Sequence, residues 1–226
     1  MNKLNQKGIL ALLSPLVFAF SFGFSTMLIS HHYFQYSLWI YIFTYSFIGV
    51  MGNVLVASKN PNLMNRRGVI YSNAQKDDKI IMFIYVFLYC FVLPMVAGLD
   101  SLNQHLIPIE SFYIALFIFV LGSLLALSAI LINPYFESLN RLQENHQVID
   151  KGLYKIIRHP GYTGMFLSSL VHPILLRSRL SFLIAILLII LVIIRTAKED
   201  KFLRENLEGY QAYCDRVKDR LIPYIW

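Results

Sequence analysis

Long apolar runs separated by short polar segments dominate this chain, and several of them have the length that a bilayer requires. The first four cover about 9–29, 33–57, 80–99 (interrupted by Pro94) and 111–132. A helix of about 20 apolar residues crosses the hydrocarbon core of a membrane. Two shorter runs follow at about 162–176 and 180–194. Neither comfortably spans a bilayer alone, so we expect them to form a tilted or partly immersed hairpin.

Composition supports a membrane protein and excludes a soluble domain, since 57% of the residues are hydrophobic and the mean hydropathy is +0.56. A net charge of +7 would suggest nucleic acid as the partner of a soluble protein. Here the basic residues follow membrane topology instead, and we expect no nucleic-acid partner. The adjacent His31 and His32 lack a third ligand at useful spacing, so we predict no metal site.

The basic residues also predict the orientation of the chain. Of the 20 lysines and arginines, all except Arg177 and Arg179 fall on one side if the runs cross the membrane in turn. Positive-inside logic makes that side cytoplasmic, with both termini on it and the 100–110 loop outside. We therefore predict an all-α polytopic membrane protein with about five to six transmembrane helices. A charged cytoplasmic helix at about 196–218 would follow them in a single domain, 1–226.

One polar stretch between the apolar runs, Asp150 to Gly164, reads D-K-G-L-Y-K-I-I-R-H-P-G-Y-T-G. Pro160 restricts the residue before it and can begin a helix, so Arg158 and His159 should lie at a helix entrance. Backbone N–H groups point outward at such an entrance, which suits a carboxylate or phosphate ligand. The alternative is a basic loop at the membrane interface whose arginine meets lipid headgroups.

A second polar cluster follows the last apolar run and contains Arg195, Glu199 and Asp200. Arg195 and Glu199 are four residues apart on a helix and can form an ion pair. Because a hairpin returns the chain to its starting side, Arg158 and Glu199 can also approach each other. A pocket with one basic and one acidic cluster suits a zwitterionic ligand with an aromatic part. The alternative is an ion pair that only solubilises an exposed tail.

Several ordered motifs resemble the isoprenylcysteine carboxyl methyltransferase family, and more narrowly its bacterial branch. They are G-L-Y-K-I-I-R-H-P-G-Y-T-G, R-T-A-K-E-D-K-F-L, E-G-Y-Q-A-Y and R-L-I-P-Y-I-W, preceded by N-P-N-L-M-N-R-R and A-G-L-D. The likeness covers roughly 58–226, whereas the spans in 1–57 are generic. The His-Pro pair alone is weakly specific because membrane sterol reductases share it. Leu153 replaces a usual proline, and the 177–179 turn replaces a commonly glycine-containing one.

The resemblance implies an integral-membrane enzyme, of a bacterial inner membrane, that uses S-adenosylmethionine in a pocket formed by 133–226. It implies a lipophilic or lipid-modified acceptor, of which a prenylcysteine-like carboxylate is the first choice. Arg158 and Glu199 take the catalytic positions. By motif position and cluster, the cofactor site would contain Tyr154, Arg158, His159, Pro160, Tyr162, Gly164, Glu199, Asp200, Tyr210 and Tyr213.

The residues present agree with methyl transfer from a sulfonium, which is an in-line displacement. A carboxylate or thiolate acceptor needs no general base at neutral pH, so positioning and exclusion of water do most of the catalysis. Aromatic rings such as Tyr162 and Tyr213 can stabilise the sulfonium by cation–π contact. Phospholipid N-methylation and small-thiol S-methylation remain open as alternatives. A sterol-type, NADPH-dependent reductase is a more distant one.

Overall fold

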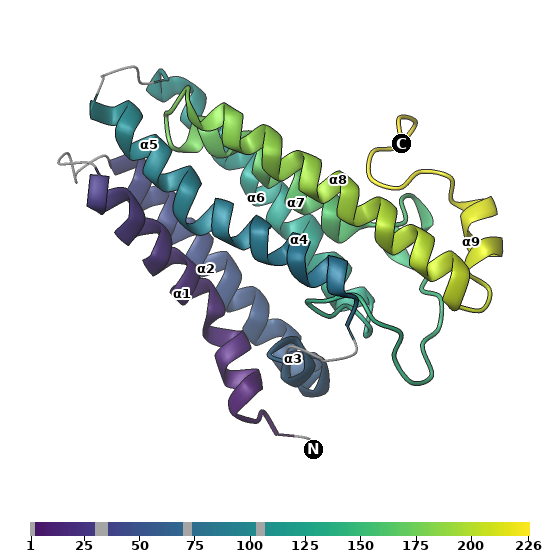
Figure 1. The fold of residues 1–226 in the computed structure, drawn as a ribbon. Helices are drawn as coiled ribbons and strands as arrows, with labels where there is room; N and C mark the ends of the chain where they lie inside the picture. The colour runs from purple at the N-terminus through teal and green to yellow at the C-terminus, as the bar shows by residue number, and fades with distance from the viewer. Residues whose placement is uncertain (1–2, 30–35, 70–73, 103–106) are drawn as a thin grey trace.

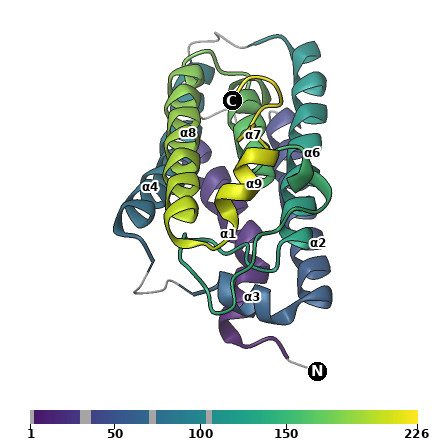
Figure 2. The same cartoon turned by 90° about the vertical axis from the view of Figure 1, so that its right-hand side faces the viewer.

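The computed structural model describes residues 3–29, 36–69, 74–102 and 107–226, and most of these residues are helical. No strand occurs among them, which confirms the predicted all-α class. His31 and His32 lie outside the described residues. The elements, shown in Figures 1 and 2, are α1 Gln6–Ile29, α2 Tyr36–Lys59, α3 Pro61–Arg67, α4 Lys76–Phe87, the π-helix η1 Leu88–Val92, α5 Leu93–Leu102, α6 Ile109–Ile132, the 3-10 helix η2 Gly152–Lys155, α7 Pro160–Leu175, α8 Ser181–Asn206 and α9 Tyr210–Arg216.

Five helical segments are long and apolar enough to cross a membrane, within the predicted five to six. They are α1, α2, the continuous segment Lys76–Leu102, α6 and α8. Large apolar side chains cover their outer faces, as at Phe20, Phe43 and Phe83, which are 73%, 70% and 71% exposed. Water would not favour so many exposed phenylalanines, whereas lipid tails would.

The predicted hairpin of two short runs is wrong in its second half. α8 is one helix of 26 residues, Ser181–Asn206, which at 1.5 Å per residue is about 39 Å long. Its apolar part continues into the charged residues 195–206 because no helix breaker separates them. The predicted tail helix at 196–218 is therefore also wrong. The chain leaves the helix at Leu207, turns at Gly209, whose φ is +78°, and forms α9 separately.

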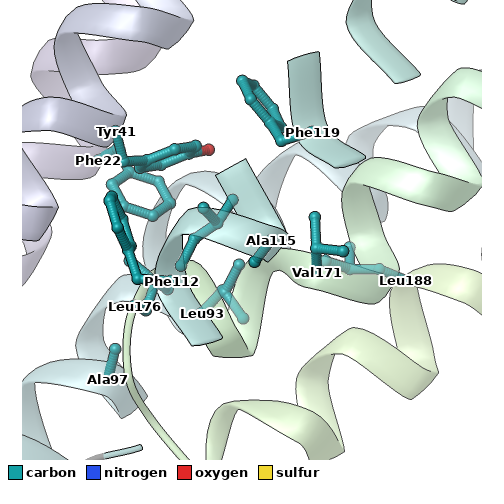
Figure 3. Close-up of a cluster of buried hydrophobic side chains, with 11 residues drawn as sticks. Phe22, Tyr41, Leu93, Ala97, Phe112, Ala115, Phe119, Val171, Leu176 and Leu188 are labelled. Carbon is teal, nitrogen blue, oxygen red and sulfur yellow. The ribbon is translucent and has the colours of Figure 1, made fainter. Parts of the chain in front are cut away.

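Helices α6 and α7 pack closely because glycines face each other. A Cβ atom on Gly164 would lie 2.4 Å from the carbonyl oxygen of Gly122, so no larger residue fits there without movement. A hydrophobic cluster fills the adjoining space, with Phe22, Tyr41 and Phe119 among its members (Figure 3). This contact fixes α7, whose first turn carries the candidate site.

The end of the chain returns to the first turn of α7. The backbone N–H groups of Arg158 and His159 donate to the carbonyls of Asp219 and Arg220, both at 3.0 Å. The Thr163 hydroxyl donates to the Leu221 carbonyl at 2.8 Å. Two segments about 60 residues apart in sequence thus lie side by side at the start of α7.

Candidate active site

The helix entrance predicted around Pro160 is present. α7 begins at Pro160, and His159 before it is non-helical, with φ −126° and ψ 60°. The imidazole of His159 stacks on the Tyr162 ring, with the ring centres 5.8 Å apart. The residue before a proline avoids the helical region, so the sequence sets this local geometry.

Asp200 forms the centre of a buried ionic cluster beside this entrance. Its side chain is 1% exposed and lies 2.9 Å from the Nε of Arg158 and 3.1 Å from that of Arg220. It also accepts hydrogen bonds from Tyr210 at 3.2 Å and meets the Nε2 of His159 at 3.3 Å. Arg204 approaches it at 3.2 Å. Protein groups therefore surround Asp200, and its charge is compensated within the chain.

The guanidinium of Arg158 is likewise paired with groups of the same chain. Besides Asp200, its guanidinium donates to the Val217 carbonyl at 3.1 Å, and the residue is only 5% exposed. Burial excludes the interface alternative, in which this arginine meets lipid headgroups. Arg158 borders the pocket described below, but its hydrogen bonds hold α7, α8 and the chain end together.

Glu199, next along α8, has a different environment. It accepts a hydrogen bond from the Tyr162 hydroxyl, and the Nδ1 of His159 is 3.9 Å away. Its side chain is 21% exposed, and no lysine or arginine of the described ranges forms an ion pair with it. Glu199 is thus a carboxylate at a pocket wall that no lysine or arginine of the described residues contacts as an ion pair, and the charge of Arg195 acts on it only from a longer distance.

The predicted ion pair between Arg195 and Glu199 is wrong. Arg195 pairs instead with Asp78 of α4, at 2.7 Å and 3.2 Å, and donates to the Ser138 carbonyl at 2.9 Å. Its guanidinium also lies 5.0 Å from the centre of the Tyr162 ring. A buried carboxylate on a neighbouring helix gains more from the cation than a partly exposed one on the same helix. Arg195 therefore does not form an ion pair with Glu199, and the Glu199 carboxylate is available to a ligand.

A pocket with an empty volume of about 780 Å³, open in part to solvent, lies between these groups and the loop 133–149. Its lining contains seven of the ten predicted site residues: Tyr154, Arg158, His159, Tyr162, Glu199, Tyr210 and Tyr213. Pro160, Gly164 and Asp200 do not border it. Pro160 begins α7, Gly164 packs on α6, and Asp200 lies behind the wall.

The loop 133–149 supplies a wall that the sequence reasoning missed. Tyr135 stacks on His146, with ring centres 4.3 Å apart, and Glu137 is held by Arg141 at 2.7 Å. Asn140 reaches the pocket while its backbone N–H donates to Asp78 at 2.8 Å. The only local signal was a polar loop rich in aromatic and amide side chains directly before the polar stretch Asp150 to Gly164.

The tyrosines around the pocket are held in their neutral form. Burial raises the pKa of Tyr154 and Tyr213 above the usual value for a phenol. Burial, with the nearby charge of Asp200, raises the pKa of Tyr210 in the same way. The Tyr213 hydroxyl donates to the Tyr154 carbonyl at 2.7 Å. These groups therefore act at neutral pH as hydrogen-bond donors and aromatic surfaces, not as bases.

A second cavity, with an empty volume of about 1090 Å³, lies within the helical bundle. Helices α1, α2, α4, α6 and α7 line it, and Gly164 and Met165 are among its α7 residues. Met82 borders this cavity and also contacts Arg195, whose cation lies over Tyr162. The layer formed by Arg195 and Tyr162 therefore separates the intramembrane cavity from the polar pocket.

Comparison with protein families supports the chemistry that this geometry suggests. Residues 113–205 match the isoprenylcysteine carboxyl methyltransferase (ICMT) family. The chain carries an ICMT family region. The match covers most of α6, all of α7 and nearly all of α8, so it includes Glu199 and Asp200 and ends before Tyr210. It confirms the resemblance noted from the motifs, and it supports a membrane methyltransferase. No curated protein matches the chain.

Proposed function

We propose that this ICMT family protein transfers a methyl group from S-adenosylmethionine to the carboxylate of a prenylcysteine-like lipophilic acceptor. The observation that carries the proposal is Glu199, a carboxylate without a cationic partner at the wall of a pocket of about 780 Å³. A partly buried carboxylate without a cation in contact gains from a ligand of opposite charge. The family match over residues 113–205 supports the reaction class.

The residues fit S-adenosylmethionine, which combines two positive centres, a carboxylate and an adenine. Glu199 offers a negative charge for the amine or a hydrogen-bond acceptor for the ribose. Tyr135, His146 and Phe202 offer aromatic or apolar surface for the adenine. When bound, the cofactor supplies an electrophilic methyl group on a sulfonium. Three arginines meet Asp200, and one of them, Arg158, borders the pocket and offers a positive charge to a carboxylate.

The work of this chain is to position reactants and exclude water. His159 stacks on the Tyr162 ring, the Arg195 guanidinium lies over that ring, and the Tyr162 hydroxyl donates to Glu199. Its position is therefore fixed before any ligand binds. An acceptor carboxylate is already ionised at neutral pH, so no general base is needed. Fixing two reactants in contact can lower a barrier by about 7–11 kcal/mol in favourable systems.

The lipophilic part of the acceptor would occupy the cavity within the bundle. Most of the residues that line this cavity are apolar, and it adjoins the polar pocket at the layer of Arg195 and Tyr162. The reacting carboxylate would then meet the cofactor near Tyr162. The acceptor would arrive from the bilayer and the cofactor from the aqueous side.

The cofactor part of the proposal is tested by binding of S-adenosylhomocysteine to the protein in detergent, measured by calorimetry. Glu199→Gln should weaken binding by about one to two orders of magnitude, since one charge-assisted hydrogen bond contributes about 1.5–3 kcal/mol. Glu205→Gln, an exposed change on the same helix, is the control and should bind as the wild type does. NADPH should not stabilise the protein. Equal affinities for wild type and Glu199→Gln would refute the role of Glu199.

The acceptor is tested separately by following a radiolabelled methyl group. The wild type should methylate N-acetyl-S-farnesylcysteine and leave its methyl ester unmodified, because the ester has no free carboxylate. Phosphatidylethanolamine and a small thiol are run beside it. Label on either of these and none on the prenylcysteine would replace the proposed acceptor while keeping the methyltransferase.

A further inference from the structure

The intramembrane cavity ends at aromatic side chains on the side away from the polar pocket. The lining residues farthest from the pocket along α2, η1, α6 and α7 are Tyr45, Tyr89, Phe119 and His172. We call these four side chains the cavity floor. Tyr41 lies behind them, with its ring centre 5.3 Å from that of Phe119 and 5.7 Å from that of His172 (Figure 3). The packed hydrophobic cluster of the bundle therefore begins where the cavity stops.

Hydrogen bonds hold the cavity floor in one arrangement. The Tyr41 hydroxyl is 2.8 Å from the Tyr89 hydroxyl and 2.8 Å from the Nε2 of His172. Tyr89 is itself 3.3 Å from that Nε2, and Tyr45 also hydrogen-bonds to Tyr89. A buried polar network whose members bond to one another is rigid, whereas a floor of leucine or methionine could move aside. Polar groups within a membrane span tend to be functional, and here they fix the position of the floor.

The distance from the reaction site to the floor can be compared with the length of a prenyl chain. Along α7 the lining runs from Gly164 to His172, which is about 12 Å at the rise of a helix. Along α6 it runs from Phe119 to Ile130, about 17 Å. An extended carbon chain advances by about 1.25 Å per bond. From its sulfur, a farnesyl chain therefore measures about 15 Å, a geranyl chain about 10 Å and a geranylgeranyl chain about 20 Å.

We propose that the cavity floor sets the chain length of the methyl acceptor and selects a farnesyl chain over geranyl and geranylgeranyl chains. The identity of the acceptor rests on the proposed function. Lipid is as apolar as the cavity, so the selection depends on packing and not on transfer from water. A geranyl chain would leave space in front of the floor and lose contacts there. A geranylgeranyl chain would have to bend against side chains that do not move.

Helix α6 offers positions at which the floor can be moved by one turn in either direction. Ala115, Phe119 and Ser123 follow one another at intervals of one turn, which is about 6 Å, and an isoprene unit is about 5 Å long. A helical side chain covers the turn on its N-terminal side, so the Phe119 ring covers Ala115, which is 1% exposed. Phe119→Ala should therefore lengthen the cavity by about one isoprene unit. Ser123 lines the cavity one turn nearer the pocket, and Ser123→Phe should shorten it by the same amount.

The test uses the geranyl, farnesyl and geranylgeranyl thioethers of N-acetylcysteine. Each competes, at equal mole fraction in nanodisc lipid, with a diazirine-labelled farnesylcysteine that is photo-crosslinked to the full-length protein, and transfer of a radiolabelled methyl group is followed in parallel. The wild type should prefer the farnesyl compound. Phe119→Ala should raise the ratio of geranylgeranyl to farnesyl binding about tenfold, because the longer chain fills the space that the ring leaves. Ser123→Phe should shift the preference towards geranyl. Phe117→Ala, on the outer face of α6 where Phe117 is 63% exposed, is the control and should keep the wild-type order.

The ratios are measured within each variant, so a change in the folded fraction cancels, and retained S-adenosylhomocysteine affinity shows that a variant is folded. The two floor variants act in opposite directions, so either of them alone tests the inference. Equal binding of the three compounds by the wild type, or the wild-type order in a folded floor variant, overturns the inference. Methyl transfer to all three compounds at equal rates would overturn it while supporting the proposed function. A farnesyl preference that moves with the floor, in a protein that transfers no methyl group to these compounds, would support the inference and refute the proposed function.

Discussion

Asp77 and Asp78, adjacent at the start of α4, provide a sharp test of how the site is held. Asp78 is 3% exposed and accepts from Arg195 at 2.7 Å and 3.2 Å. It also accepts from the backbone and side-chain nitrogens of Asn140, at 2.8 Å and 3.1 Å. One carboxylate therefore joins α4 and α8 to the loop wall of the pocket. Asp77 lies in the open and pairs with the exposed Lys198.

We expect Asp78→Asn to be strongly destabilising and Asp77→Asn to change little. Removing one partner of a buried ion pair typically costs about 3–5 kcal/mol because the other charge is left uncompensated. With about 2–4 °C per kcal/mol for a chain of this size, the unfolding temperature should fall by roughly 6–20 °C. An asparagine keeps one acceptor oxygen, so the lower half of that range is expected.

The assay is thermal unfolding in detergent, followed by tryptophan fluorescence, with S-adenosylhomocysteine binding measured on the same samples. Asp78→Asn should also weaken ligand binding, since Asn140 and the Arg195 cation near Tyr162 lose their anchor. Adding Arg195→Met to Asp78→Asn removes the orphaned charge. The double variant should therefore be less destabilised than the sum of the two single changes. An Asp78→Asn protein as stable as Asp77→Asn would refute this account of the site.

Three further predictions concern other parts of the chain. Arg158→Lys keeps the charge but not the two guanidinium hydrogen bonds, to Asp200 and to the Val217 carbonyl, so turnover should fall at least tenfold and stability with it. Wild-type values in both measurements would contradict this. Burial lowers the pKa of His146 to about 4, below the unfolded value of about 6.5, so the unfolded state takes up the proton first as the pH falls. The unfolding temperature should therefore decline between pH 6.5 and pH 4, and His146→Phe should lose this part of the decline. Cysteines placed at Glu110 and Asp215 should be labelled from opposite sides of the membrane, and labelling from the same side would refute the predicted topology.

Much of the fold was predictable because a bilayer restricts which sequences and structures can cross it. Backbone polar groups must be satisfied within each span, so a long apolar run can only be a helix, and the run lengths predicted nearly all of them. The start of α7 was equally local, since a proline restricts both itself and His159 before it. The end of α8 was not, because continuing a helix past the membrane surface costs little and leaves no mark in the sequence until Gly209 turns the chain.

The sequence by itself identified the two polar clusters, the reaction class that their motifs resemble, and the division between lipid-facing spans and a polar end. It did not decide which charges pair. Arg195 had a carboxylate four residues away on its own helix, yet it pairs with Asp78, more than 100 residues away, and Arg158 is held by Asp200. Pairing of buried charges depends on which partners are desolvated together, and only the packing of α4, α7 and α8 determines that. Tertiary structure alone therefore distinguishes the neutralised Asp200 from the available Glu199 beside it.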